Sequence, residues 1–385
     1  MRVTRVGLVA AALVTTAAGV AVPAAPTALA APTDQAAPAE RTARLAAAGE
    51  GLRSGRTPVA DGDVVATPGS DAVLLAVTWR GRLDGLRLRT RDAAGDWTPW
   101  REPGLLADGP DAAGSDLVGA ARVDPVRGSD LLPVADAAAV QVDVLGPTPR
   151  DLTLVVLAPE QTAADRATTA ARPTTARRGP ASRKPAMRTR ADWGANPRWR
   201  SGAPRYNRTI RQVHVHHTVN GNDYTRAEVP GLLRAIYRYH TQSLGWSDIG
   251  YNFVVDRFGR TWVGRAGGAW QAVQGAHTLG FNSTSTGVAV LGTFEERAPR
   301  RDVLKALARL AAWKLYRHQL SPRGRVRVRS EGSDLYAAGR VVRLPAVDGH
   351  RDTSRTACPG EKLYAHLDDV RRRATARVAR WKAAR

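Results

Sequence analysis

The stretch TIRQVHVHH (residues 209–217) begins the second half of this chain, in which segments with the two-residue period of a strand alternate with segments whose period of about 3.6 residues is that of a helix. Its alternation of apolar and polar residues predicts a β-strand. The later segments predict, in order, a helix, a hairpin, a buried strand and two helices, over residues 227–243, 251–264, 286–294, 302–320 and beyond 360. Strands that alternate with helices predict an α/β domain over residues 187–385, with a mixed central sheet flanked by helices.

The first half of the chain has a different pattern. It contains the short apolar runs AVLLAVTW, LDGLRLRTRD, AVQVDVLG and DLTLVVLAP, separated by Gly, Pro and Asp clusters. These runs predict a small all-β, sandwich-like domain over residues 31–160, with a flexible N-terminal part. Because its ionisable residues form no recognisable site, we expect a non-catalytic accessory domain. Residues 161–186 are rich in Ala, Thr, Pro and Arg, which predicts a linker.

The N-terminus has the composition of a secretory signal peptide. MRVTR precedes the apolar run VGLVAAALVTTAAGVAV, and ALA at residues 28–30 is a small-x-small cleavage pattern. The run is about 17 residues of mostly Ala and Val, which is marginal for a bilayer span. We therefore predict a signal peptide over residues 1–30 and a secreted protein, extracellular or associated with the cell wall, with no stable membrane span after cleavage. An uncleaved anchor is the alternative.

Charge is distributed unevenly along the chain, whose net charge is +22. Residues 31–160 carry 13 basic and 19 acidic side chains, whereas residues 187–385 carry 36 and 15. A basic second half favours an anionic partner, and acidic wall polymers are the candidates outside a cell. The alternative is that an acidic and a basic domain attract each other. The export signal and the lack of a recognition motif argue against nucleic acid, and the sequence predicts no particular oligomeric state.

The only cysteine of the chain, Cys358, lies in GHRDTSRTACPG, eight positions after His350. Three more histidines lie in HVHH at the end of the predicted strand: His214, His216 and His217. Imidazole and thiolate are ligands that zinc prefers, and a catalytic zinc uses three of them and leaves a fourth position open. Strand alternation places His214 and His216 on one face and His217 on the other, so spacing alone does not say which of them binds. Each histidine taken singly also fits a hydrogen-bonded structural role.

Five blocks, taken in order, resemble the peptidoglycan recognition protein family: TRADWGA, VHHT, GWSDIGYNFVVDRFGRTWVGR, QGAHTLGFNSTSTGVAVLGTF and GHRDTSRTACPG. This family belongs to the zinc-dependent N-acetylmuramoyl-L-alanine amidases, which include the phage T7 lysozyme type. The resemblance covers nearly all of residues 187–370. It implies a bacterial hydrolase that cleaves the amide between the lactyl group of N-acetylmuramic acid and L-alanine in peptidoglycan.

The resemblance also implies roles for individual residues. Its motifs place the zinc ligands at His216, His350 and Cys358. They place Tyr251 beside the zinc-bound water, Thr356 two residues before the cysteine ligand, and His217, Trp246 and His277 along the substrate groove. Because Tyr251 and Thr356 can each donate a hydrogen bond, either could stabilise negative charge on the reacting carbonyl. Members that lack activity typically have serine at the position of Cys358, so the thiol favours an enzyme over the alternative, a non-catalytic peptidoglycan-binding protein. The Gly- and Ala-rich stretch GRAGGAWQAVQGAH leaves the preferred stem peptide open.

Overall fold

The computed structural model describes residues 41–49, 51–67, 73–107, 109–111, 125–170 and 183–384. The predicted signal peptide lies outside the described residues, as does the middle of the predicted linker. None of the described helices is both long and apolar enough for a membrane span.

Two sheets form the N-terminal part of the structure. The first has the strand order β1 (Arg41–Thr42), β4 (Val64–Ala66), β9 (Ala139–Leu145), β6 (Gly85–Arg91). The second has the order β2 (Ala46–Gly49), β3 (Leu52–Pro58), β10 (Arg150–Pro159), β5 (Val73–Arg80), β7 (Arg127–Gly128), and β8 (Leu132–Val134) also pairs with β5. Apolar residues of both sheets, such as Val142 and Leu154, share one core. The predicted all-β, sandwich-like domain is confirmed.

The two central strands of the second sheet are buried on both faces. Leu75 and Leu154 point into the core of the sandwich. Their neighbours Leu74 and Val155 instead belong to a second cluster, which also contains residues of the α/β part. Burial on both faces explains why the runs VLLAV and LTLVVLA are almost continuously apolar.

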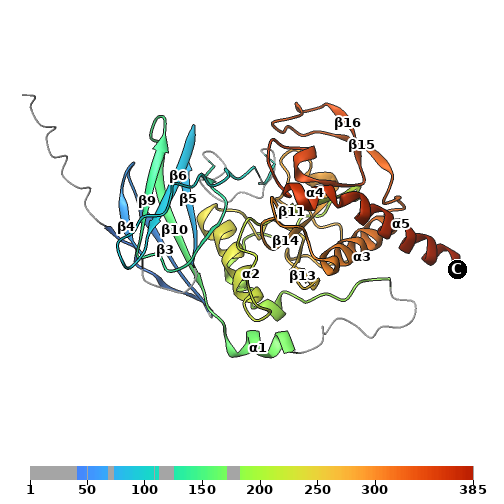
Figure 1. Cartoon of the computed structure of the whole chain (residues 1–385). Coiled ribbons are helices and arrows are strands. Elements are labelled where there is room, and N and C mark those ends of the chain that lie inside the picture. The colour runs from blue at the N-terminus through green and yellow to red at the C-terminus, as the bar shows by residue number, and fades with distance from the viewer. Residues whose placement is uncertain are drawn as a thin grey trace, which may run out of the picture. The chain divides into compact units, whose positions relative to one another are not determined.

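The α/β part is built on a five-stranded mixed sheet. Its order is β13 (Thr261–Val263), β12 (Phe253–Val255), β14 (Ser285–Val290), β11 (Gln212–His217), β17 (Val347–Gly349). Neighbouring strands are parallel, except that β13 is antiparallel to β12. In Figure 1, helix α2 (Val229–Arg238) lies on one side of β11 and β14, and α3 (Arg301–Arg317) and α5 (Leu367–Ala383) lie on the other. The predicted α/β class is confirmed.

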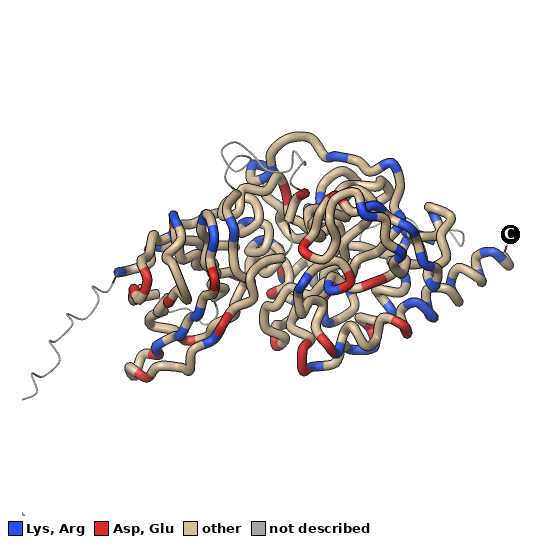
Figure 2. Tube along the Cα trace, turned by 90° about the horizontal axis from the view of Figure 1, so that it is seen from above, with Lys and Arg blue, Asp and Glu red and all other residues tan. Residues whose placement is uncertain are grey.

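Several elements were not predicted. RVRVR forms β15 (Arg325–Arg329), which pairs with β16 (Val341–Pro345), and the single helix predicted beyond residue 360 is divided into α4 (Glu361–Ala365) and α5. Helix α1 (Ala163–Ala170) lies within the predicted linker. It has no apolar stripe to reveal it in the sequence; its buried residue Asp165 instead pairs with Arg234 of α2, 2.7 Å apart. Figure 2 shows Lys and Arg positions along α5, which contributes to the basic charge of this part.

The second apolar cluster joins the two parts of the chain. It contains Leu74, Leu131 and Leu157 from the sandwich, together with Leu232 and Ile236 from α2. Residues 38–385 accordingly form a single compact unit.

Candidate active site

Strand β11 lies between β14 and β17 in the α/β sheet and carries histidines on its α2 side. Its residues Val213 and Val215 belong to the apolar cluster that contains α3 and α5. Strand alternation turns His214 and His216 to the other face, where both are fully buried. A buried imidazole needs polar partners, because burial without them costs about 1–3 kcal/mol.

Three side chains meet at the end of β11. A donor atom from each of His216, His350 and Cys358 lies within 4.8 Å of the other two. His350 follows β17 directly, and the register pairs Val215 of β11 with Gly349 of β17, so the two histidines meet at the same strand ends. Their ring centroids are 4.7 Å apart.

Cys358 reaches the cluster through a closed loop. The backbone N–H of Arg351 donates to the Cys358 carbonyl at 2.9 Å, which brings the cysteine back beside His350. Its Sγ lies 3.8 Å from His216 Nδ1 and accepts the backbone N–H of His217 at 3.4 Å. A backbone donor of this kind favours a thiolate over a neutral thiol.

The ring of His216 is oriented by His277. His216 Nε2 lies 3.1 Å from His277 Nδ1, so the other nitrogen, Nδ1, is directed to Cys358. Burial, and secondarily the neighbouring His214, lowers the pKa of His216 well below its ordinary value. Burial also lowers the pKa of His277 well below its ordinary value. Both rings are thus neutral, and a His216 that donates from Nε2 presents the lone pair of Nδ1 to a ligand. His277 is held in turn, because its backbone N–H donates to Asn282 Oδ1 at 2.8 Å.

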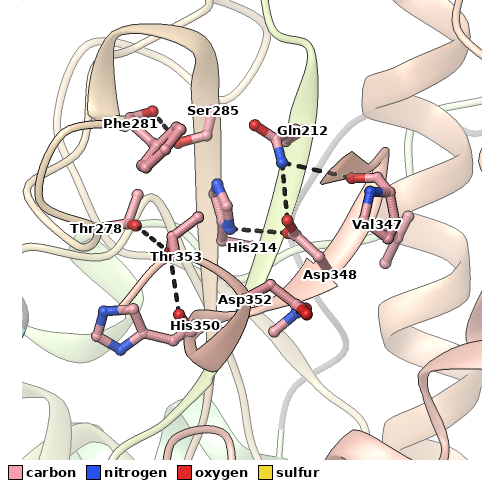
Figure 3. A network of polar contacts seen from close by, with 12 residues as sticks. Gln212, His214, Thr278, Phe281, Ser285, Val347, Asp348, His350, Asp352 and Thr353 are labelled. Carbon is pink, nitrogen blue, oxygen red and sulfur yellow. Dashed lines mark hydrogen bonds and ion pairs between the residues drawn. The ribbon is translucent and has the colours of Figure 1, made fainter. Parts of the chain in front are cut away.

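His214 belongs to a separate polar network, shown in Figure 3. Its Nδ1 lies 2.8 Å from Asp348 Oδ1, and Gln212 Nε2 donates to Asp348 Oδ2 at 2.8 Å. Burial raises the pKa of Asp348 to about 6, although His214 opposes the shift. Spacing alone left the ligand within HVHH open, and the family resemblance named His216. The structure brings His216 to the cluster and pairs His214 with Asp348.

Threonines fix the backbone that carries His350. Thr353 Oγ1 donates to the His350 carbonyl at 3.0 Å and lies 2.9 Å from Thr278 Oγ1, as Figure 3 shows. The next turn is closed by Asp352, whose Oδ2 accepts the Gly349 N–H at 2.9 Å. The position of His350 is therefore set by main-chain and side-chain hydrogen bonds on both sides.

A pocket of about 450 Å³ opens beside the cluster. From the α/β part it is lined by His217, Tyr251, His350, Thr356 and Cys358, all singled out in the sequence, and by His240, which was not. Tyr251 is 4% exposed, and its ring centroid lies 5.4 Å from that of His216. Thr356 Oγ1 accepts the Cys358 N–H at 3.2 Å.

Trp246 and His277 do not line this pocket, in contrast to the groove positions expected for them. Trp246 packs against His240 with ring centroids 4.4 Å apart, and His277 is fully buried behind His216. His240 lies in a π-helical turn (Tyr239–Ser243) that continues α2, and its Nδ1 accepts the Gly250 N–H at 3.0 Å. The helical spacing of the sequence marked His240 only as part of an apolar face.

The donor set fits zinc. A tetrahedral zinc has bonds of about 2.0–2.3 Å to nitrogen and sulfur, which places its ligand atoms about 3.3–3.8 Å apart. The donor atoms of His216, His350 and Cys358 need only a small contraction from their 4.8 Å limit to meet this geometry. Two imidazoles and one thiolate leave one tetrahedral position toward the pocket.

Comparison with known proteins assigns the family. Residues 206–361 match the family described as N-acetylmuramoyl-L-alanine amidase, and residues 26–181 match the one described as Rv3811 N-terminal galactose-binding domain-like. Peptidoglycan-recognition protein SC1a of Drosophila melanogaster is 30% identical over 180 residues, which are 46% of this chain and 82% of that protein. Human N-acetylmuramoyl-L-alanine amidase is 34% identical over 184 residues, 47% of this chain and 27% of that protein.

Among solved structures, peptidoglycan recognition protein-LE in complex with tracheal cytotoxin is 27% identical, with a TM-score of 0.38, over 48% of this chain and 92% of that one. The fold is an α/β sheet flanked by helices, and its clustered residues form a candidate metal site. The chain belongs to the family of peptidoglycan-recognition proteins and N-acetylmuramoyl-L-alanine amidases, and the resemblance found in the sequence is confirmed.

Proposed function

We propose that this protein is a zinc-dependent hydrolase that cleaves the amide between the N-acetylmuramoyl lactyl group and L-alanine in peptidoglycan. The observation that carries the proposal is the convergence of His216, His350 and Cys358 beside a pocket. The side chains of Tyr251 and Thr356 line the same pocket. A structural role alone does not account for an imidazole pair and a thiol buried side by side at the edge of a pocket.

His216, His350 and Cys358 would hold the zinc. When bound, zinc supplies Lewis-acid chemistry, which acidifies a water molecule and polarises a carbonyl. Neighbouring groups orient two of these ligands. The contact with His277 directs the Nδ1 of His216 to the cluster, and the His217 N–H donates a hydrogen bond to the Cys358 sulfur.

Tyr251 and Thr356 would act as hydrogen-bond donors to the substrate carbonyl oxygen as negative charge develops on it. Both side chains carry a hydroxyl group, which can donate a hydrogen bond at neutral pH. Thr356 Oγ1 already accepts the Cys358 N–H, so its own hydroxyl hydrogen is available to donate toward the pocket.

We also propose that the protein acts outside the cytoplasm, where peptidoglycan lies. The proposal is supported by residues 1–30, in which a basic start, an apolar run and a small-x-small motif follow one another as in a secretory signal peptide. The basic α/β part would favour contact with anionic wall polymers.

The decisive experiment is incubation of the full chain with purified muropeptides, with zinc added and after chelation. We expect free stem peptide in the presence of zinc and none after chelation, as measured by liquid chromatography with mass spectrometry. If zinc-loaded protein binds muropeptides without releasing peptide, the second candidate, a non-catalytic peptidoglycan-binding protein, replaces the first. That candidate is favoured by the recognition proteins among the relatives.

A further inference from the structure

One wall of the pocket comes from the β-sandwich part. Besides the residues of the α/β part, the pocket is lined by residues 102 and 104–107, and by Asp130 and Leu131. This segment, residues 102–107, is called the sandwich wall below. It brings apolar side chains and the Glu102 carboxylate to the same cavity as Cys358.

Main-chain hydrogen bonds hold the sandwich wall. Leu105 pairs with Ser129 in an antiparallel bridge, the Leu106 N–H donates to the Gly128 carbonyl at 2.9 Å, and the Asp130 N–H donates to the Gly104 carbonyl at 2.7 Å. The Ser129 carbonyl accepts the hydroxyl of Tyr239 from the α/β part at 2.7 Å. Main-chain bonds that a side-chain substitution at Leu105 leaves in place therefore hold the backbone of the wall.

A second attachment follows a few residues later. Asp111 is 3% exposed, and its Oδ1 accepts the Gly280 N–H at 2.5 Å and the Asn282 side-chain amide at 3.1 Å. The same amide donates to the Gly109 carbonyl at 2.9 Å. Because Asn282 Oδ1 also accepts the His277 N–H, this attachment is connected to the backbone beside the candidate metal cluster.

The side chain of Leu105 is 42% exposed although its backbone is fixed. An apolar side chain that is held open toward a pocket is suited to contact a ligand, because burying it on binding gains free energy with little loss of conformational entropy. The other leucines of the lining, Leu106 and Leu131, extend the apolar surface beside it.

We propose that the sandwich wall is part of the substrate groove and that Leu105 contacts the methyl and methylene groups of a bound muramyl peptide. The proposal rests on the peptidoglycan substrate of the proposed function. It makes the β-sandwich a part of the binding site and not a separately tethered module. Leu105 is a specificity-determining contact and has no role in the bond cleavage itself.

The test compares two exposed leucines of the same sandwich in the full chain. Leu105→Ala removes the wall contact, and Leu145→Ala, at a residue that is 36% exposed at the end of β9 and does not line the pocket, is the matched control. Binding of a purified monomeric muropeptide is measured by calorimetry in the presence of a chelator, so that no cleavage occurs. We expect a Kd about 3- to 10-fold higher for Leu105→Ala and a change of less than about 2-fold for Leu145→Ala.

Equal Kd values for the two variants would overturn the proposal, and so would tighter binding by Leu105→Ala, which would make the wall an obstruction. No binding by the wild-type chain would contradict the peptidoglycan substrate itself and the wall with it. If the wild-type chain binds the muropeptide through Leu105 but releases no stem peptide when zinc is added, only the catalytic part of the proposed function is contradicted. Thermal unfolding of both variants checks that the fold is kept, as the main-chain bonds of the wall predict.

Discussion

The β-sandwich and the α/β part bury different kinds of residues. Among the described residues up to 160, the buried polar ones are Thr67, Thr78, Asp111, Ser129 and Thr153. The α/β part buries His214, His216, His277 and His350 to 2% exposure or less, together with Asp348. Buried ionisable groups cost free energy that apolar residues would not. In the α/β part four buried histidines lie in or beside the candidate metal cluster, whereas the sandwich contributes apolar packing and one side of the pocket lining.

The difference also shows how the two parts depend on each other. Asp111, a buried carboxylate of the sandwich, accepts hydrogen bonds from Gly280 and Asn282 of the α/β part. The acidic and basic charge of the two halves suggested mutual attraction, yet this contact pairs a carboxylate with neutral donors. The sandwich is thus attached at the site by directional hydrogen bonds and at α2 by apolar burial.

The largest effect is expected from Cys358→Ser, which removes the thiolate from the buried cluster. We expect loss of bound zinc and of amidase activity together, because a hydroxyl is a much poorer zinc ligand than a thiolate at neutral pH. Metal content is measured by mass spectrometry, activity by peptide release, and folding by circular dichroism. A folded variant that keeps both zinc and activity would show that the metal assignment is wrong.

Arg234→Met tests the attachment of α1 and the sandwich to α2. The Arg234 guanidinium donates to both oxygens of Asp165, and to the Glu160 carbonyl at 3.1 Å, while it is 3% exposed. Loss of one partner leaves a buried carboxylate without its cation, so we expect the free energy of unfolding to fall by about 3–5 kcal/mol. Denaturant unfolding measures the change.

The control for this ion pair is Arg372→Met, because Arg372 pairs with Asp368 at the surface, where the two side chains are 53% and 51% exposed. We expect a change below about 1 kcal/mol there. Equal losses from the two variants would mean that the buried pair does not join the parts of the chain.

His277→Phe tests the outer contact of the cluster. The variant removes the acceptor for His216 Nε2 and with it the bond that orients the ligand, so we expect zinc affinity to fall about 10- to 100-fold. His277→Gln, whose side-chain oxygen can accept the same bond, should restore part of the affinity. Zinc affinity is measured by competition with a chromogenic chelator. His318→Phe, at a histidine that contacts the Ile210 N–H, is the control, and an equal loss there would contradict a specific role for His277.

The smallest effect concerns Lys314, a buried group of the α/β part that does not line the pocket. Its Nζ donates to the carbonyls of Ala269 and Gln271, and burial lowers its pKa to about 7. Between pH 7 and the ordinary lysine pKa near 10.5, the unfolded chain holds this proton more often than the folded chain, so stability should rise with pH.

Relative to Lys314→Met, the wild-type chain should gain at most about 1.4 kcal/mol of unfolding free energy per pH unit in this range. Urea unfolding at pH 7, 8 and 9 measures the difference. Lys305→Met, at an exposed surface pair with Asp302, should show no such trend. A trend of the same size for both lysines would contradict the burial of Lys314 as its cause.

Much of the local structure could be predicted from the sequence. Strands β5, β6, β9 and β10 of the sandwich, β11 to β14 of the α/β sheet, and helices α2, α3 and α5 followed from their apolar periodicity. Strands β1 to β4, β7, β8 and β17 were not predicted. The strands β15 and β16 and the helix α1 were missed, because alternating Arg and Val gives a weak signal and α1 is held by an ion pair instead of an apolar face. A periodic apolar pattern indicates which side of an element is buried against an apolar surface, but it does not reveal an ion pair such as that of α1.

The site was only partly predictable. The family motifs named His216, His350 and Cys358, whose convergence the structure displays. They did not name His240 or the sandwich wall in the pocket, and they expected His277 in the groove instead of behind His216. These placements depend on the turn after α2 and on contacts between residues more than 100 positions apart, as in the bond between Tyr239 and Ser129.

The sequence by itself determined the α/β and all-β classes, the chemistry of the donor residues and the family. Only the tertiary structure decided that the neighbouring His214 pairs with Asp348 and which parts of the chain line the pocket. The physical reason is that side-chain type and period fix what a residue can bond to and which side of an element is buried. The partner that covers that side is set by strand register, as between Val215 and Gly349, and by packing between distant segments.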